Sequence, residues 1–256
     1  MKKTIIALFA LAGVASADTI SPITDTASGS WTTHGTAQVK DGVISATNTN
    51  WQVDAATYTL SSSLNYATTD TLSFSFNATN NGTGNSCLTL ALIGSTNAIV
   101  LGHGSYDKPA DEIQVAVTSD VSVTGGYVFA NTNPTDDLTL TAADTLSGGM
   151  PANGSTSTIS GSISWDGDSW ALELGSSATS ATLSYDLGIT TLGVSKIMVT
   201  IEGGGAPDNG NTAWQTPTMS NLSISTPSVA PAVPEPTTAT LSLLALAGLA
   251  ARRRRR

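Results

Sequence analysis

Apolar and polar residues alternate along most of this chain. The clearest alternating runs are residues 72–76, 113–117, 159–163, 183–185, 197–201 and 222–224. Because a strand turns successive side chains to opposite faces, each run collects apolar residues on one face. No window of a dozen residues combines helical apolar spacing with helix caps. The pattern predicts an all-β body whose strands have one apolar face and one small, hydroxylated face.

Turn sequences separate these runs. Lys40-Asp41-Gly42 joins residues 36–39 to 43–46, and Asp166-Gly167-Asp168 joins 159–165 to 170–174, so both predict β-hairpins. Longer loops rich in Gly and Asn lie at 102–111, 131–137 and 203–213. Binding sites of β-sandwiches normally sit in such loops.

The first residues have the features of a secretory signal peptide. Lys2 and Lys3 precede an apolar run at 5–14, and Ala15-Ser16-Ala17 supplies the small residues that a signal peptidase needs. We therefore expect residues 1–17 to be removed and the exported chain to begin at Asp18.

The last residues predict a short membrane helix. Residues 237–251 carry no charge and no proline, and as a helix they would rise about 22 Å, less than the roughly 30 Å of a bilayer core. A basic cluster follows and would stop the chain on the cytoplasmic side: Arg252, Arg253, Arg254, Arg255 and Arg256. Before the helix, a proline-rich spacer at 226–236 ends in Pro234, Glu235 and Pro236, which favour extended backbone.

This order of Pro-Glu-Pro, apolar helix and terminal arginines resembles the PEP-CTERM sorting domain of Gram-negative bacteria. The resemblance implies that an exosortase, a membrane transpeptidase, recognises Pro234, Glu235 and Pro236. It also implies removal of the helix and basic tail and delivery of the protein to the cell surface or extracellular matrix. The alternatives are an ordinary tail anchor and a C-terminal helix of the domain with a solvated basic end.

The body, residues 18–225, is long enough for one large sandwich domain. The order of four features resembles that in concanavalin A-like or laminin-G-like jelly rolls. The features are early tryptophans (Trp31 and Trp51), the 72–76 strand, the 165–170 hairpin and a last strand at 219–225. The resemblance implies an antiparallel β-sandwich with adjacent first and last strands. An immunoglobulin-like or other Greek-key sandwich is the alternative, but its Cys–Trp–Cys signature is absent from the sequence.

The net charge of the exported chain excludes some classes of binding partner. Between the signal peptide and Pro234, three lysines face eighteen acidic residues, a net charge of −15. Such an acidic chain is not suited to bind nucleic acid or an anionic membrane surface.

Cys87 is the single cysteine and lies in an apolar run, so we expect a buried small side chain, with intermolecular pairing or a reactive thiol as alternatives.

Catalytic patterns are sparse. Retaining glycosidases need two carboxylates about 5 Å apart, whereas Glu112, Glu173 and Glu202 lie near separate predicted strands. A Glu173/Glu202 pair would have to be assembled by the fold. His34 and His103 are the only histidines, and the sequence has no Gly-x-Ser-x-Gly nucleophile elbow. We expect a protein that is not an enzyme, with a glycan-acting hydrolase on the same fold as the alternative.

Two groups of residues are candidates for ligand binding. Asp166 and Asp168, or Asp136 and Asp137, could hold calcium, and Asp166 and Asp168 could instead simply form a polar turn. Trp165, Trp170 and Trp214 could stack on sugar rings, or could fill the rim of the core. The sequence thus predicts a structural or adhesive surface protein that binds glycans. A cleft lined by Ser, Thr and Trp would favour binding, and two converging carboxylates would favour the enzyme.

Overall fold

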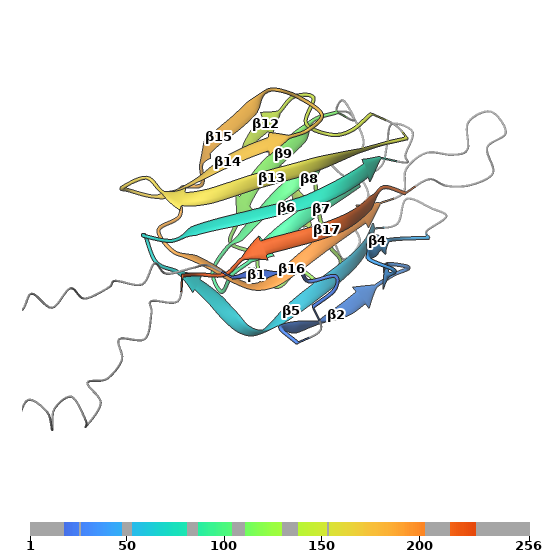
Figure 1. Ribbon diagram of the computed structural model, residues 1–256, viewed down its shortest axis with the longest axis horizontal. Helices are drawn as coiled ribbons and strands as arrows, with labels where there is room; N and C mark the ends of the chain where they lie inside the picture. Colours follow the sequence, from blue (N-terminus) through green and yellow to red (C-terminus); the bar gives the residue numbers. More distant parts are fainter. Residues whose placement is uncertain are drawn as a thin grey trace, which may run out of the picture. The chain divides into compact units, whose positions relative to one another are not determined.

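The structure is a computed structural model, shown in Figure 1. It describes residues 18–25, 27–47, 53–80, 87–103, 111–129, 138–152, 154–202 and 216–228. The compact unit that contains the sandwich runs from Ala17 to Pro227. The expected signal peptide, the Pro-Glu-Pro motif, the apolar helix at 237–251 and the arginine tail lie outside the described residues.

Every regular element among the described residues is a strand. In chain order they are β1 (Thr19–Ile20), β2 (Gly29–His34), β3 (Gln38–Lys40), β4 (Val43–Ser45), β5 (Val53–Tyr66), β6 (Thr71–Asn80), β7 (Cys87–Ile93), β8 (Ala98–His103), β9 (Ile113–Thr118), β10 (Tyr127–Phe129), β11 (Leu138–Leu140), β12 (Asp144–Leu146), β13 (Ser155–Trp165), β14 (Trp170–Ser176), β15 (Thr182–Asp186), β16 (Leu192–Glu202) and β17 (Thr218–Ser225). Each alternating run of the sequence lies in one of these strands, which confirms the all-β prediction. In the part of the chain that is described, no helix is long and apolar enough to cross a membrane.

The strands form two layers (Figure 1). Sheet A has the order β15-β14-β13-β6-β17-β4-β3, with β1 also paired to β17, and sheet B has the order β12-β9-β8-β7-β16-β5-β2. All pairs within these sheets are antiparallel, whereas β10 and β11 form a separate parallel pair. Thr19 lies opposite Ser225, so the first and last strands are adjacent, as the jelly-roll resemblance implied.

The main core lies between the inner faces of the two sheets. Phe74 and Phe76 of β6 are 3% and 2% exposed, and Leu90 of β7 and Ile197 of β16 are fully buried in the same apolar cluster. Ser73 and Ser75, which alternate with the phenylalanines, point to the outer face of sheet A. Sheet A therefore has the one apolar and one hydroxylated face that the alternation predicted.

Sheet B differs from this expectation, because the centre of its outer face is also covered. All residues of β7 and β8 are buried. Tyr127 and Phe129 of β10 pack on that face in a second apolar cluster. The Thr89 hydroxyl donates to the Tyr127 carbonyl at 2.8 Å, and the Tyr127 amide donates to the Thr200 hydroxyl at 3.1 Å. These bonds satisfy polar groups that would otherwise be buried alone.

Both predicted hairpins are present. Asp41 and Gly42 connect β3 to β4 with φ of 53° and 79°, the left-handed backbone of a tight two-residue turn. Trp165 lies opposite Trp170 at the β13–β14 hairpin. Cys87, at the start of β7, is fully buried, in agreement with the expected small core residue.

Candidate functional site

The outer face of sheet A carries aligned rows of small polar residues. The pairing register places Ser223 (β17), Ser75 (β6), Ser160 (β13), Gly175 (β14) and Thr182 (β15) side by side, and we call this set row 1. Row 2 lies two residues along each strand and consists of Ser73, Ser162, Glu173 and Ser184. Every member of the two rows is exposed or half-buried.

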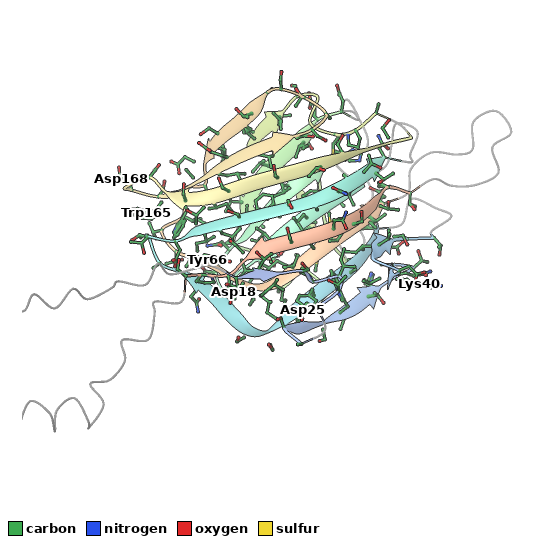
Figure 2. All side chains as sticks on the ribbon, viewed as in Figure 1. Asp18, Asp25, Lys40, Tyr66, Trp165 and Asp168 are labelled. Carbon is green, nitrogen blue, oxygen red and sulfur yellow. The ribbon has the colours of Figure 1, made fainter. Side chains whose placement is uncertain are left out.

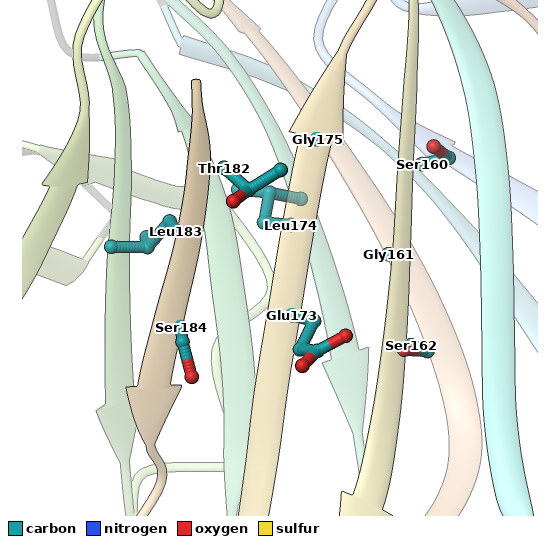
Figure 3. Close-up of a pocket in the computed structure, with 9 residues that line it drawn as sticks. All are labelled: Ser160, Gly161, Ser162, Glu173, Leu174, Gly175, Thr182, Leu183 and Ser184. Carbon is teal, nitrogen blue, oxygen red and sulfur yellow. The ribbon is translucent and has the colours of Figure 1, made fainter. Parts of the chain in front are cut away.

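A shallow hollow of about 400 Å³ lies where both rows cross β13, β14 and β15. It is lined by Ser160, Gly161, Ser162, Glu173, Leu174, Gly175, Thr182, Leu183 and Ser184. Figure 3 shows Ser162, Glu173 and Ser184 following one another across the three strands. The floor of the hollow at Gly175 is open, since a β-carbon added there would meet no atom within 4 Å.

The polar side chains of the hollow are available to a ligand. No intramolecular hydrogen bond involves the side chains of Ser160, Ser162 or Glu173 within the described structure. Elsewhere on the same face the hydroxyl groups pair with one another: Thr79 and Thr156 lie 2.7 Å apart, and Thr158 donates to Asn77 at 2.9 Å. The hollow thus combines unengaged hydroxyl groups with a single carboxylate.

Among the described residues, Glu173 is the only charged group that lines the hollow. Its side chain is exposed on β14, flanked by Ser162 on β13 and Ser184 on β15. Of the two lysines among the described residues, Lys40 lies on β3 at the opposite edge of sheet A, and Lys196 lies on β16 of sheet B. The local potential of the hollow is therefore negative, which disfavours anionic ligands.

The candidate catalytic pair is not brought together. Glu202 is 1% exposed at the end of β16 in sheet B, whereas Glu173 is exposed on the outer face of sheet A. Glu112 precedes β9 in sheet B. Of the histidines, His103 is buried at the end of β8, and His34 is exposed at the end of the edge strand β2.

Trp165 and Trp170 lie opposite each other at the end of the β13–β14 hairpin, where Figure 2 labels Trp165. Trp170 is 1% exposed, and Trp165 is half-buried against the core with its ring centroid 5.9 Å from that of Trp170, edge to face. The Trp170 ring therefore fills the core, the other role that the sequence left open, and cannot stack on a sugar. Trp214 lies outside the described residues.

The candidate calcium residues form the hairpin turn. The Asp166 Oδ1 accepts hydrogen bonds from the amides of Asp168 and Ser169, each at 3.0 Å, and these bonds lower the pKa of Asp166. The Ser169 hydroxyl donates to Asp186 at 2.5 Å and, with the Gly188 amide, lowers the pKa of that carboxyl group. Within the described ranges, no group of three or more acidic, His or Cys side chains is arranged to hold a metal ion. Asp136 and Asp137, a second acidic pair, lie outside those ranges.

The sequence did not identify the hollow. Alternation placed Ser160, Ser162 and Ser184 on a polar face, but the hollow depends on which strands are neighbours and in what register. Gly175 was the available signal, since an isolated glycine inside a strand can mark a place where another group approaches closely.

Comparisons with known proteins bear on both parts of the chain. Residues 232–256 match the family model described as the PEP-CTERM protein-sorting motif, which confirms the resemblance of the tail to that sorting motif. The motif implies export to the cell surface and processing by an exosortase. No curated protein matches the chain.

Solved structures resemble the sandwich. The Emp47p carbohydrate recognition domain aligns with a TM-score of 0.50 and 12% identity, over 84% of this chain and 99% of that one. Peanut lectin aligns with a TM-score of 0.48 and 11% identity, over 84% and 98% of the two chains. A protein described as a native glycosidic hydrolase aligns at 0.46 and 9%, over 85% and 99%. The chain thus carries a PEP-CTERM protein-sorting motif and a β-sandwich with the fold of a lectin-like domain.

Proposed function

We propose that this protein is a structural or adhesive component of the cell surface whose sandwich binds neutral glycans. The observation that carries the proposal is the hollow on sheet A, where unengaged hydroxyl groups and one carboxylate surround an open floor at Gly175. Sugar hydroxyl groups both donate and accept hydrogen bonds, and Ser and Thr side chains do the same, so the two surfaces are chemically complementary.

The charge of the site favours uncharged sugars. Glu173 accepts hydrogen bonds from sugar hydroxyl groups, and such charge-assisted bonds are roughly twice as strong as neutral ones. The same carboxylate repels uronic acids and sulfated sugars. The exported chain as a whole, with a net charge of −15, repels them as well. Neutral glycans are therefore favoured over acidic ones.

We further propose that the hollow binds glycans without cleaving them. Retaining and inverting glycosidases generally use a pair of carboxylates that flank the scissile bond. Glu173 is the one carboxylate among the described residues that line the hollow. The alternative, a glycan-acting hydrolase, predicts release of reducing ends from a polysaccharide, and that release would be abolished in Glu173→Gln.

The test uses the protein recovered from the surface or medium of expressing cells and a panel of neutral and uronic acid oligosaccharides. Gly175→Val fills the floor of the hollow with a residue that suits a strand, and Glu173→Gln removes the charge while keeping the shape. We expect each change to weaken binding of neutral glycans about tenfold or more, which corresponds to the loss of one or two strong hydrogen bonds.

The matched control is Asp41→Asn, which removes one negative charge from the exposed β3–β4 hairpin. This variant should bind glycans as the unaltered protein does. Failure of every glycan to bind would refute the proposed activity. Unchanged binding by both hollow variants would place the binding site elsewhere.

A further inference from the structure

Row 1 continues beyond the hollow. From Thr182 it passes through Gly175 and Ser160 to Ser75 on β6 and Ser223 on β17. Five neighbouring strands at about 4.8 Å spacing give the row a length of about 19 Å. Row 2 runs beside it from Ser184 to Ser73.

The strip formed by the two rows is uniform in chemistry. Its members are serines, one threonine, one glycine and Glu173, so the strip contains no aromatic or aliphatic side chain. Ser75 and Ser223, at the far end, lie 3.0 Å apart and share one hydrogen bond. Each hydroxyl oxygen has two lone pairs, so both can also bond to a ligand.

The direction of the strip is set by its surroundings. Toward the start of β13 the next outward residues are Thr158 and Thr156, which already bond to Asn77 and Thr79. Toward its end the one further outward residue is Ser164, next to Trp165, where the strand ends. Across the strands, by contrast, the hollow leads directly to Ser75 and Ser223. A ligand that starts in the hollow therefore finds further available groups across the sheet.

We infer that the ligand of this site is an extended neutral polysaccharide that lies across five strands, from Thr182 to Ser223. This inference rests on the proposed glycan binding and deepens it. Several sugar units contact the strip at once, so the protein recognises the middle of a chain rather than a terminal sugar. Each additional sugar adds hydrogen bonds until the strip is filled.

The first test measures how affinity depends on chain length in the unaltered protein. The probes are cello-, manno-, xylo- and N-acetylchito-oligosaccharides, each from disaccharide to hexasaccharide, titrated calorimetrically. We expect the affinity for the matching series to rise at least tenfold from disaccharide to hexasaccharide. If the disaccharide binds as tightly as the hexasaccharide, the inference is overturned although glycan binding itself stands. If no series binds, the proposed function itself is refuted.

The second test separates the far end of the strip from the hollow. Ser75→Ala combined with Ser223→Ala removes both members of one hydrogen-bonded pair, so neither hydroxyl group is left without its partner. The matched control, Thr79→Ala combined with Thr156→Ala, removes a similar pair at 2.7 Å. That pair lies on the same face, about 13 Å from Ser75 along β6.

We expect the Ser75/Ser223 variant to bind the hexasaccharide about tenfold more weakly and the disaccharide unchanged. The control variant should bind both as the unaltered protein does. Equal hexasaccharide affinity in the two variants would overturn the inference. Thermal unfolding of both variants checks that each is folded. The dependence of affinity on oligosaccharide length, measured with the unaltered protein, tests the inference without either variant.

Discussion

Two glycines on neighbouring strands allow a test of how sheet A packs. Gly161 of β13 faces the core, and a β-carbon there would lie 2.4 Å from Cζ and 2.8 Å from Cε1 of Phe74. It would also lie 3.0 Å from the backbone oxygen of Glu173. Gly175 of β14 faces solvent, with no atom within 4 Å of the added carbon. The same substitution, Gly→Ala, should therefore have opposite effects at the two positions.

The magnitude follows from two terms. Replacing glycine with alanine in a strand reduces the entropy lost on folding and stabilises by about 0.5–1 kcal/mol. At Gly161 this gain is opposed by overpacking against Phe74, which is 3% exposed and has little room to move; overpacking costs about 1–3 kcal/mol. Because the first term is common to both sites, the two variants should differ in unfolding free energy by about 1–3 kcal/mol.

The assay is urea unfolding followed by tryptophan fluorescence, since Trp165 and Trp170 report on the sandwich. Gly175→Ala should unfold at higher urea than the unaltered protein, and Gly161→Ala at lower urea. Adding Phe74→Leu to Gly161→Ala should relieve the overpacking, so the double variant should be more stable than the sum of the single changes predicts. Equal stability of the two alanine variants would refute the close packing of Phe74 on Gly161.

Three further predictions concern stability and sorting. Burial raises the pKa of Tyr127 to about 12, so the stability contributed by its neutral hydroxyl group should be complete below pH 10 and lost as the pH rises to about 12. Tyr127→Phe should flatten that part of a plot of unfolding free energy against pH. An unchanged plot would contradict the raised pKa of Tyr127. Because Asp166 is engaged by backbone amides, the thermal midpoint should not change when calcium is added or chelated, and an upward shift with calcium would instead support an ion site. Glu235→Ala combined with Pro236→Ala should leave the full-length chain in the membrane fraction, whereas intact mass of the unaltered surface protein should give a chain that begins near Asp18 and ends near the Pro-Glu-Pro motif; normal release of the variant would contradict exosortase processing.

The sequence by itself determined the local elements and the tail. A period of two identified the strands, because one buried face imposes it regardless of which strand is the neighbour. Asp41 and Gly42 identified a hairpin, because few residues adopt left-handed backbone easily. The sorting motif at 232–256 was legible because its residues are contiguous in the chain.

Only the tertiary structure decided which strands are neighbours and what covers them. Row 1 joins Thr182 to Ser223, with Ser75 between them in space although it is more than a hundred residues from either in sequence, and no local pattern records that pairing. The alternation of apolar and polar residues also could not predict that Trp170 is buried or that Tyr127 covers the outer face of sheet B, because burial depends on what packs against a face. Hydrophobic period fixes which way a side chain points, and long-range contacts fix what it meets.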